Sequence, residues 1–214
     1  MDTLPAGHFL LLHDDLRSSM MQDDLGVLAL PSGRLALNGG YAPMANEAVE
    51  AEIAVPPGQY RVQVLTVSSE DTLRQWHVGV VVNDRRPFRA AYLADSAGKI
   101  RLINRATNEA CLIDAAGIEA LAHRPGYDPN NETWLEPYDE KYNPRIPGNG
   151  IMVSSPDRTL TAALAYADDT SSYGVIIGYD ETDQIVWAGV EALCPWHPQD
   201  YEREPNLIHT VAKS

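Results

Sequence analysis

The segment Gly26-Val-Leu-Ala-Leu-Pro-Ser-Gly-Arg-Leu-Ala-Leu-Asn38 shows the pattern that decides the fold. Its two largely apolar runs, 26–30 and 34–38, are short, and the turn sequence Pro31-Ser-Gly33 separates them. Short apolar runs around a glycine-containing loop are typical of a β-hairpin. The segment therefore predicts two antiparallel strands joined as a hairpin.

The same pattern of short strands and turns continues along the chain. After the turn Pro56-Pro-Gly58, the residues Tyr60, Val62 and Val64 alternate with polar ones, as in a strand with one buried face. Further strands are predicted at 47–55, 76–83, 88–94, 98–103, 160–167, 173–179 and 185–190. The last two are expected to form a hairpin around the polar turn 180–183.

Helical signals are few. Asp114 precedes the segment 115–122 and can accept hydrogen bonds from the free amides of a first helical turn. Ser155-Pro-Asp157 also resembles a helix start, although a strand over 160–167 is preferred. Residues 125–150 are rich in proline and aromatic side chains and are interpreted as a long irregular loop. Residues 194–214 are interpreted as a C-terminal surface tail.

These patterns together predict the fold class. We expect an α+β fold that is β-rich, with mostly antiparallel sheets in a sandwich-like arrangement and one or two short helices. The chain shows no internal repeat and no domain linker. Residues 1–214 are therefore expected to form a single domain.

The charge balance restricts the choice of partners. Thirty Asp and Glu residues against sixteen Lys and Arg give a net charge of −14. Such a surface repels nucleic-acid phosphates and anionic lipids, so neither nucleic acid nor membrane is an expected partner. It attracts basic proteins, such as a toxin, although solubility alone also accounts for an acidic excess. Two cysteines and an N-terminus without a basic region make the cytoplasm the expected location.

Four segments carry a family resemblance: Gly26–Leu35, Pro56–Val62, Ala110–Leu121 and Tyr173–Asp180. In this order they resemble an uncharacterised bacterial family, the domain of unknown function 4241. Where that family has a Gly-Asp-Gly turn before the tyrosine strand, this chain has Asp168-Asp-Thr-Ser-Ser172. The resemblance implies a β-rich bacterial cytoplasmic protein and supplies no catalytic residues. It also implies an antitoxin-like role, because such families occur near polymorphic toxin systems.

The residues that carry chemistry show no catalytic spacing. No segment has the pattern of a metal site, a phosphate loop or a nucleophile elbow, so we predict no catalytic residue, metal ligand or cofactor. His77 lies in an apolar strand and is interpreted as a partly buried histidine rather than a ligand. The carboxylate pairs, including Asp23-Asp24 and the turn 180–183, are interpreted as solvated turns. Cys111 and Cys194 are interpreted as small buried thiols.

Two groups of residues are candidates for binding. Aromatic side chains are favoured interface anchors because they bury a large area at low entropic cost. The predicted anchors are Trp134, Tyr138 and Tyr142, with Glu132, Glu136, Asp139 and Glu140 at the rim. Residues 53–105 are locally basic, with eight basic against four acidic side chains. Arg85, Arg86 and Arg89 in this segment are candidates for binding an anion.

Three functional hypotheses remain open at this point. The first is a non-catalytic acidic binding protein, most concretely an immunity protein that neutralises a toxin. The second is an enzyme of unrecognised class, hydrolase-like, whose site is assembled from distant residues. A pocket that holds His77 or His123 beside a carboxylate would favour it. The third is a homo-oligomeric structural protein that uses exposed edge strands, which its mass in solution would reveal.

Overall fold

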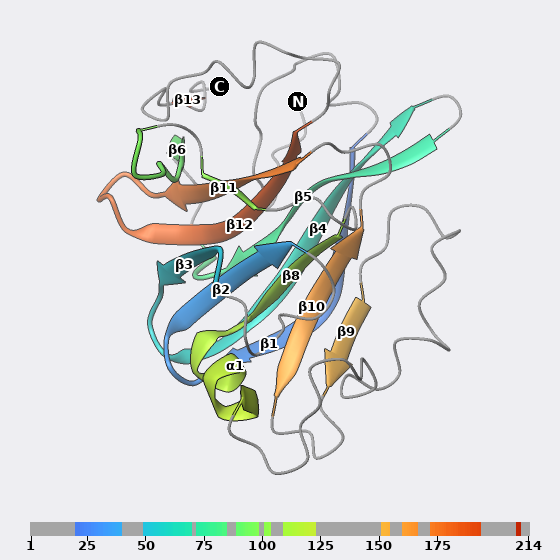
Figure 1. Cartoon of the computed structure of the whole chain (residues 1–214). Coiled ribbons are helices and arrows are strands. Elements are labelled where there is room, and N and C mark those ends of the chain that lie inside the picture. Colours follow the sequence, from blue (N-terminus) through green and yellow to red (C-terminus); the bar gives the residue numbers. More distant parts are fainter. Residues whose placement is uncertain are drawn as a thin grey trace.

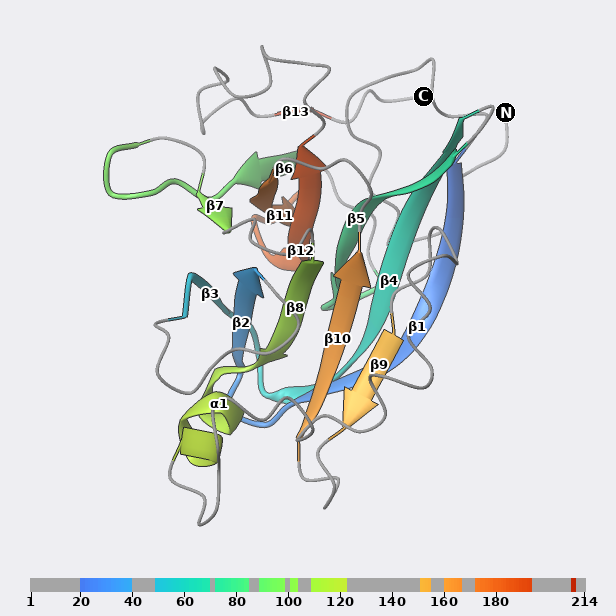
Figure 2. The ribbon, with the colours of Figure 1, turned by 45° about the vertical axis from the view of Figure 1, so that its right-hand side comes forward.

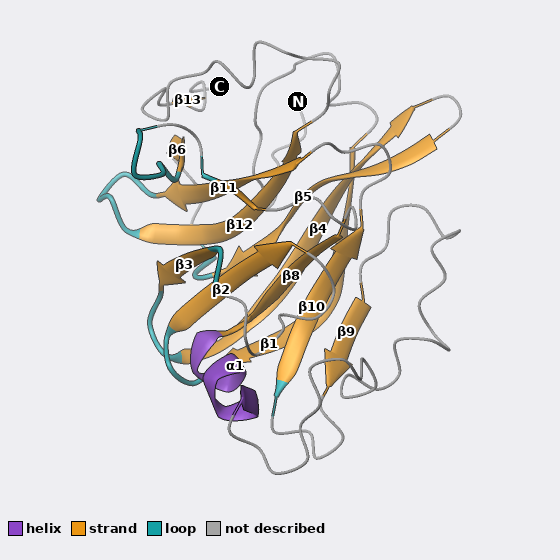
Figure 3. Cartoon of the chain, viewed as in Figure 1, coloured by secondary structure: helices purple, strands orange, loops and turns teal. Residues whose placement is uncertain are grey.

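Two antiparallel β-sheets lie face to face in the described part of the chain (Figure 1). The computed structural model describes residues 20–39, 49–69, 72–84, 89–98, 101–103, 109–122, 151–154, 160–166, 172–193 and 209–210. Strands dominate these ranges, and the helix there is a single short element (Figure 3). The β-rich, antiparallel and sandwich-like prediction is therefore confirmed.

The larger sheet, sheet A, contains eight strands. They are β1 (Met20–Leu30), β4 (Gly58–Ser69), β5 (Thr72–Val81), β6 (Arg89–Tyr92), β7 (Leu102–Ile103), β11 (Ser172–Tyr179), β12 (Ile185–Leu193) and β13 (His209–Thr210). Their spatial order is β1-β4-β5-β12-β11-β6-β13, and β7 pairs with β11.

Sheet B contains five strands and lies in front of β1, β4 and β5 in Figure 2. They are β2 (Arg34–Gly39), β3 (Ala51–Ala54), β8 (Glu109–Asp114), β9 (Ile151–Ser154) and β10 (Thr161–Tyr166). Their spatial order is β3-β2-β8-β10-β9. The helix α1 (Ala115–Ala122) follows β8 directly and contacts β2 and β8.

The core lies between the two sheets. Leu28 and Val62 of sheet A belong to the same apolar cluster as Leu112 and Ala163 of sheet B, and all four are fully buried. Removing these side chains from water on both inner faces is the main force that holds the sandwich together. Cys111 is also fully buried, as the sequence predicts for a small apolar thiol.

The predicted hairpin over residues 26–38 is wrong. β1 pairs with β4 in sheet A, whereas β2 pairs with β3 and β8 in sheet B. The turn itself is present, because the Gly33 amide donates to the Leu30 carbonyl over 3.1 Å and Gly33 has a φ of 69°. A tight turn alone does not decide whether the next strand pairs with the last one. Here the chain instead crosses between the sheets, so that both runs bury leucines in the shared core.

Most of the other predicted elements are confirmed. β10 is a strand, as preferred over a helix, and β11 and β12 form the expected hairpin. Asp114 caps α1, since its Oδ1 accepts a hydrogen bond from the Gly117 amide over 3.2 Å. The loop 125–150, residues 155–159 and most of the tail 194–214 lie outside the described residues. Within the tail, β13 pairs with β6.

Asp180 corrects a second prediction. The turn 180–183 was expected to be solvated throughout, yet Asp180 is only 4% exposed. Its Oδ1 accepts hydrogen bonds from the Thr182 amide, the Thr182 hydroxyl and the Gln184 amide, at 2.7–3.0 Å. These bonds replace the water that a buried carboxylate loses. Glu181 and Asp183 of the same turn are exposed, as expected.

Arg34 ties sheet B to the helix on the surface. Its guanidinium contacts Glu52 of β3 at 2.9 Å and Glu119 of α1 at 3.1 Å. Hydrogen bonds to Glu52 and then to Glu119 raise the pKa of Arg34 above its ordinary value, so the side chain stays charged. Because all three side chains are well exposed, the network contributes little to stability. No helix in the described ranges has the length and hydrophobicity of a membrane span.

Candidate functional site

The residues predicted as a protein-binding site are not placed by the structure. All seven lie outside the described residues: Trp134, Tyr138, Tyr142, Glu132, Glu136, Asp139 and Glu140. Arg85 and Arg86 of the predicted anion site also lie outside. These assignments therefore stay predictions from the sequence.

Arg89 is placed by its backbone. It is the first residue of β6, where it pairs with Tyr179 of β11 and with Thr210 of β13. This position puts Arg89 at the same end of sheet A as the acidic turn after Tyr179. Opposite charges at one end of a sheet partly cancel in their effect on an approaching ion.

A second basic residue of this segment is already engaged by acids. Arg61 of β4 contacts Asp24 of β1 at 3.4 Å and Asp84 at 2.8 Å. Its positive charge is thus partly compensated on the surface of sheet A. Residues 53–105 are basic in composition, but neighbouring carboxylates balance the charge of Arg61 within this segment.

The described residues contain a buried polar cluster on the face of sheet A that points away from sheet B. Successive side chains of a strand point to opposite faces. Ala188 and Val190 of β12 belong to the core between the sheets, so Trp187 and Glu191 lie on the other face, the outer face. His77 pairs directly with Glu191 in the β5–β12 ladder and shares that face.

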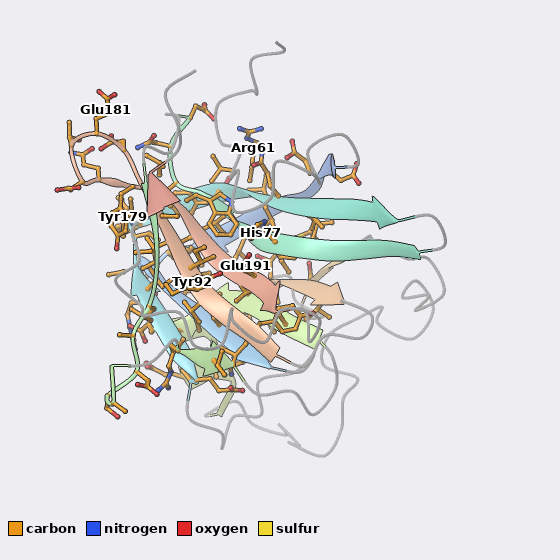
Figure 4. The ribbon with its side chains drawn as sticks, turned by 90° about the horizontal axis from the view of Figure 1, so that it is seen from above. Arg61, His77, Tyr92, Tyr179, Glu181 and Glu191 are labelled. Atoms are coloured by element: carbon orange, nitrogen blue, oxygen red, sulfur yellow. The ribbon has the colours of Figure 1, made fainter. Side chains whose placement is uncertain are left out.

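Three ionisable side chains, His77, Tyr92 and Glu191, meet in this cluster (Figure 4), and Trp187 is its fourth member. The Tyr92 hydroxyl donates to Oε2 of Glu191, and Nε2 of His77 lies 3.4 Å from Oε1 of the same carboxylate. The indole of Trp187 meets the His77 ring edge-on, with ring centroids 6.2 Å apart. Tyr92 is 5% exposed, His77 2% and Glu191 1%.

Glycines make room for this arrangement. Gly79 and Gly189 form a directly opposed pair of the β5–β12 ladder. A Cβ on Gly79 would overlap the Trp187 indole, and one on Gly189 would lie 2.7 Å from the same ring. The Trp187 indole therefore packs against backbone that carries no side chains, because positions 79 and 189 are both glycine.

The cluster has the parts of a proton-transfer site but lacks exposure. A carboxylate beside an imidazole can orient the ring and stabilise its charged form, which is the arrangement of a general base. Side chains that are 1–2% exposed do not reach a substrate unless the cover over them moves. Among the described residues, no group of three or more His, Cys, Asp or Glu side chains is arranged to hold a metal ion.

The sequence contained only part of this information. The sequence predicts a partly buried His77, and in the structure the side chain is almost completely buried, at 2% exposure. Glu191 was missed, although a single acid inside the largely apolar strand 185–193 is a signal for a buried charge. Tyr92 was placed in a predicted strand, but the carboxylate that it reaches is 99 residues away in the chain.

A second feature of sheet A is an acid-rich end. Glu181 and Asp183 are exposed on the β11–β12 turn, and Figure 4 shows Glu181 projecting well away from the buried cluster. The amide of Asn83 donates to the Val186 carbonyl over 3.3 Å, which brings the end of β5 beside the start of β12. Asp84 follows Asn83 and has an 81% exposed side chain.

Comparisons with protein-family models, with curated proteins and with solved structures find no match to this chain. The resemblance to the domain of unknown function 4241 therefore stays a prediction from the sequence.

Proposed function

We propose that the protein is a non-catalytic binding protein whose acidic surface engages a basic partner protein, as an immunity protein engages a toxin. The observation that carries this proposal is the net charge of −14, with exposed carboxylates presented on a rigid sheet. Charges of one sign on a surface accelerate encounter with a partner of the opposite sign. The proposal includes a bacterial cytoplasmic setting, as the family resemblance implies.

The acid-rich end of sheet A supports a role in steering. Its carboxylates Glu181 and Asp183 lie on the β11–β12 turn, which backbone hydrogen bonds hold beside the end of β5, whereas Asp84 at that strand end is ion-paired with Arg61. Charges at an interface rim change the association rate more than the dissociation rate. Affinity in this proposal comes from aromatic anchors, for which Trp134, Tyr138 and Tyr142 are the candidates.

The double substitution Glu181→Gln and Asp183→Asn tests the steering role. We expect it to slow association with the partner about three- to tenfold at low salt, with a smaller change in the dissociation rate. Asparagine suits position 183 because it tolerates the positive φ of 61° found there. The partner would be identified by co-expression with the product of the neighbouring gene, scored by rescue of growth, and the rates measured by surface plasmon resonance.

The matched control is the double substitution Asp23→Asn and Asp24→Asn, which removes the same charge from exposed residues of β1. Equal slowing by both pairs would show that only net charge matters and would contradict a directed role for the turn. Failure of any neighbouring product to bind the unmodified protein, or to be neutralised by it, would overturn the binding proposal.

A second candidate function is a hydrolase-like enzyme, favoured by the carboxylate that lies 3.4 Å from His77. If the cluster is catalytic, His77→Ala is expected to lower activity on a responsive ester, phosphate or glycoside substrate by at least 100-fold. Screening the unmodified protein against chromogenic substrates of these classes would provide the activity. A response that survives His77→Ala unchanged would exclude His77 as its general base.

A further inference from the structure

Sheet A contains two hairpins that are joined by the β5–β12 pairing. In the first hairpin, β4 and β5 are separated by two residues, since Ser69 pairs with Thr72. In the second, the Asp180 amide donates to the Gln184 carbonyl over 2.9 Å and closes the turn between β11 and β12. Short turns fix the register of the strands that they join. No such turn sets the register of β5 and β12, which are far apart in the sequence.

The core-facing residues do little to fix this register. They are Val78, Val80 and Val82 on β5, and Ala188 and Val190 on β12. If β12 moved two positions along β5, Val190 would lie opposite Val80 and Ala188 opposite Val82. A slip of one residue would reverse the two faces, but a slip of two keeps the inner face apolar. At this pairing the core therefore allows both the observed register and the slipped one.

The outer face distinguishes the two registers. In the observed register Glu191 is paired with His77, and Oε1 of the carboxylate lies 3.4 Å from Nε2 of the imidazole. In the slipped register Glu191 would lie opposite Gly79, and His77 opposite Leu193. The carboxylate and the imidazole would then be about 7 Å further apart along the strands. A buried carboxylate that loses a partner in this way opposes the slip.

Tyr92 extends the same constraint to β6. Its backbone pairs with Ile176 of β11, but its hydroxyl donates to Glu191 of β12, one strand further. The position opposite Glu191 on β11 is Gly174, which has no side chain to stand between them. Tyr92 and Glu191 are 99 positions apart, so no turn sets their alignment. One carboxylate thus contacts side chains of β5 and β6, which flank the β11–β12 hairpin on opposite sides.

We infer that the Glu191 carboxylate, through its contacts with His77 and Tyr92, selects the register in which the β11–β12 hairpin joins β5 and β6. Buried polar groups can specify one arrangement among several that the apolar residues allow, without adding stability. This role needs no access from solvent, which agrees with the 1–5% exposure of the three side chains. It is the same in a binding protein and in an enzyme.

The selected register also shapes the acid-rich end of sheet A. The amides of Val82 and Asn83 donate to the Val186 carbonyl at 2.9 and 3.3 Å, so the end of β5 lies beside the start of β12. A slip of two residues would move the β11–β12 turn by about 7 Å relative to Asp84. The register therefore decides how the acidic side chains at this end are spaced.

The triple substitution His77→Leu, Tyr92→Phe and Glu191→Met tests the selection. It replaces the polar groups by apolar ones of similar size and leaves both glycines and Trp187 in place. We expect a folded protein whose urea midpoint does not fall, because apolar residues replace a buried polar group without loss of stability. We also expect a second set of amide signals from β5 and β12, with about 10% of the intensity or more.

Nuclear Overhauser contacts between opposed residues identify the register of each set of signals. In the observed register Gly189 lies opposite Gly79, whereas in the slipped register it would lie opposite Val81. The unmodified protein should show only the first contact, and the minor signals of the triple variant should show the second. The contact between Val62 and Val80 within the β4–β5 hairpin is the internal reference and should persist throughout.

The matched control exchanges the two partners, His77→Glu with Glu191→His. It keeps a carboxylate opposite an imidazole and leaves the net charge unchanged. Because the pair is complete only in the observed register, we expect a single set of signals with the Gly79–Gly189 contact. A second register in this variant would show that the pair does not make the selection.

Two results from the triple variant would also overturn the inference. One is a single set of signals in the observed register, because the glycine pair and the apolar residues would then suffice to select it. The other is loss of folding or a lower urea midpoint, because the polar contacts would then supply stability rather than a choice between registers.

Discussion

Gly189→Ala is expected to lower the free energy of unfolding by about 4 kcal/mol or to prevent folding. A Cβ at position 189 would overlap the Val78 carbonyl oxygen and lie 2.5 Å from the Cα of Gly79. Both are backbone atoms of β5, the strand that pairs with β12, so no change of side-chain rotamer relieves the overlap. The ladder would have to separate at the centre of sheet A.

Urea denaturation followed by tryptophan fluorescence would measure this effect. Gly58→Ala is the matched control, because the nearest atom to its new Cβ is the Tyr60 hydroxyl oxygen at 3.3 Å, the end of a side chain. We expect the control to lose no more than about 1 kcal/mol. Similar losses in the two variants would show that the close approach of β5 and β12 is not a constraint.

Asp114→Ala is expected to lower the free energy of unfolding by about 3 kcal/mol. One carboxylate oxygen accepts the Ser32 amide at 3.0 Å and the Ser32 hydroxyl at 2.8 Å, and the other accepts the Gly117 amide. Asp114 is 1% exposed, so donors left without it are poorly reached by water. Loss of this residue detaches the β1–β2 corner and the start of α1 together.

Two further variants separate these contributions. Asp114→Asn retains one acceptor oxygen and should lose about half as much stability as Asp114→Ala. Asp95→Ala is the control, since Asp95 also accepts a backbone hydrogen bond, from the Ala97 amide at 2.8 Å, but in an exposed turn. If Asp95→Ala lowers the free energy of unfolding as much as Asp114→Ala does, the buried hydrogen bonds of Asp114 do not stabilise the β1–β2 corner more than an ordinary turn. Thermal unfolding followed by far-UV circular dichroism would rank the three variants by stability.

The strands could be predicted because their signals are local. In β4, Tyr60, Val62 and Val64 are buried while Arg61 is exposed, as the alternation predicts, although Gln63, expected on the exposed face, is only 5% exposed. Turn residues and the cap of α1 depend on a few neighbouring positions in the same way. Sequence patterns therefore located most elements, including the choice of strand over helix for β10.

The candidate site could be predicted only in fragments. His77 attracted notice because a histidine in an apolar strand is unusual, but its carboxylate neighbour lies 114 positions later in the chain. The hydroxyl that completes the cluster comes from β6, which reaches Glu191 across β11. No local pattern encodes which of the many acids and tyrosines in this chain will meet.

The sequence by itself located most of the strands, though not β8, β9 or β13, and it identified Asp114 as the start of the helix, because backbone preferences act over a few residues. Only the tertiary structure decided that β1 and β2 separate into two sheets and that Tyr92, His77 and Glu191 share one buried face. The turn Pro31-Ser-Gly33 is compatible with a hairpin and with a crossing between sheets. What selects the crossing is the burial of Leu28 and Leu37 in one core, to which strands distant in sequence contribute.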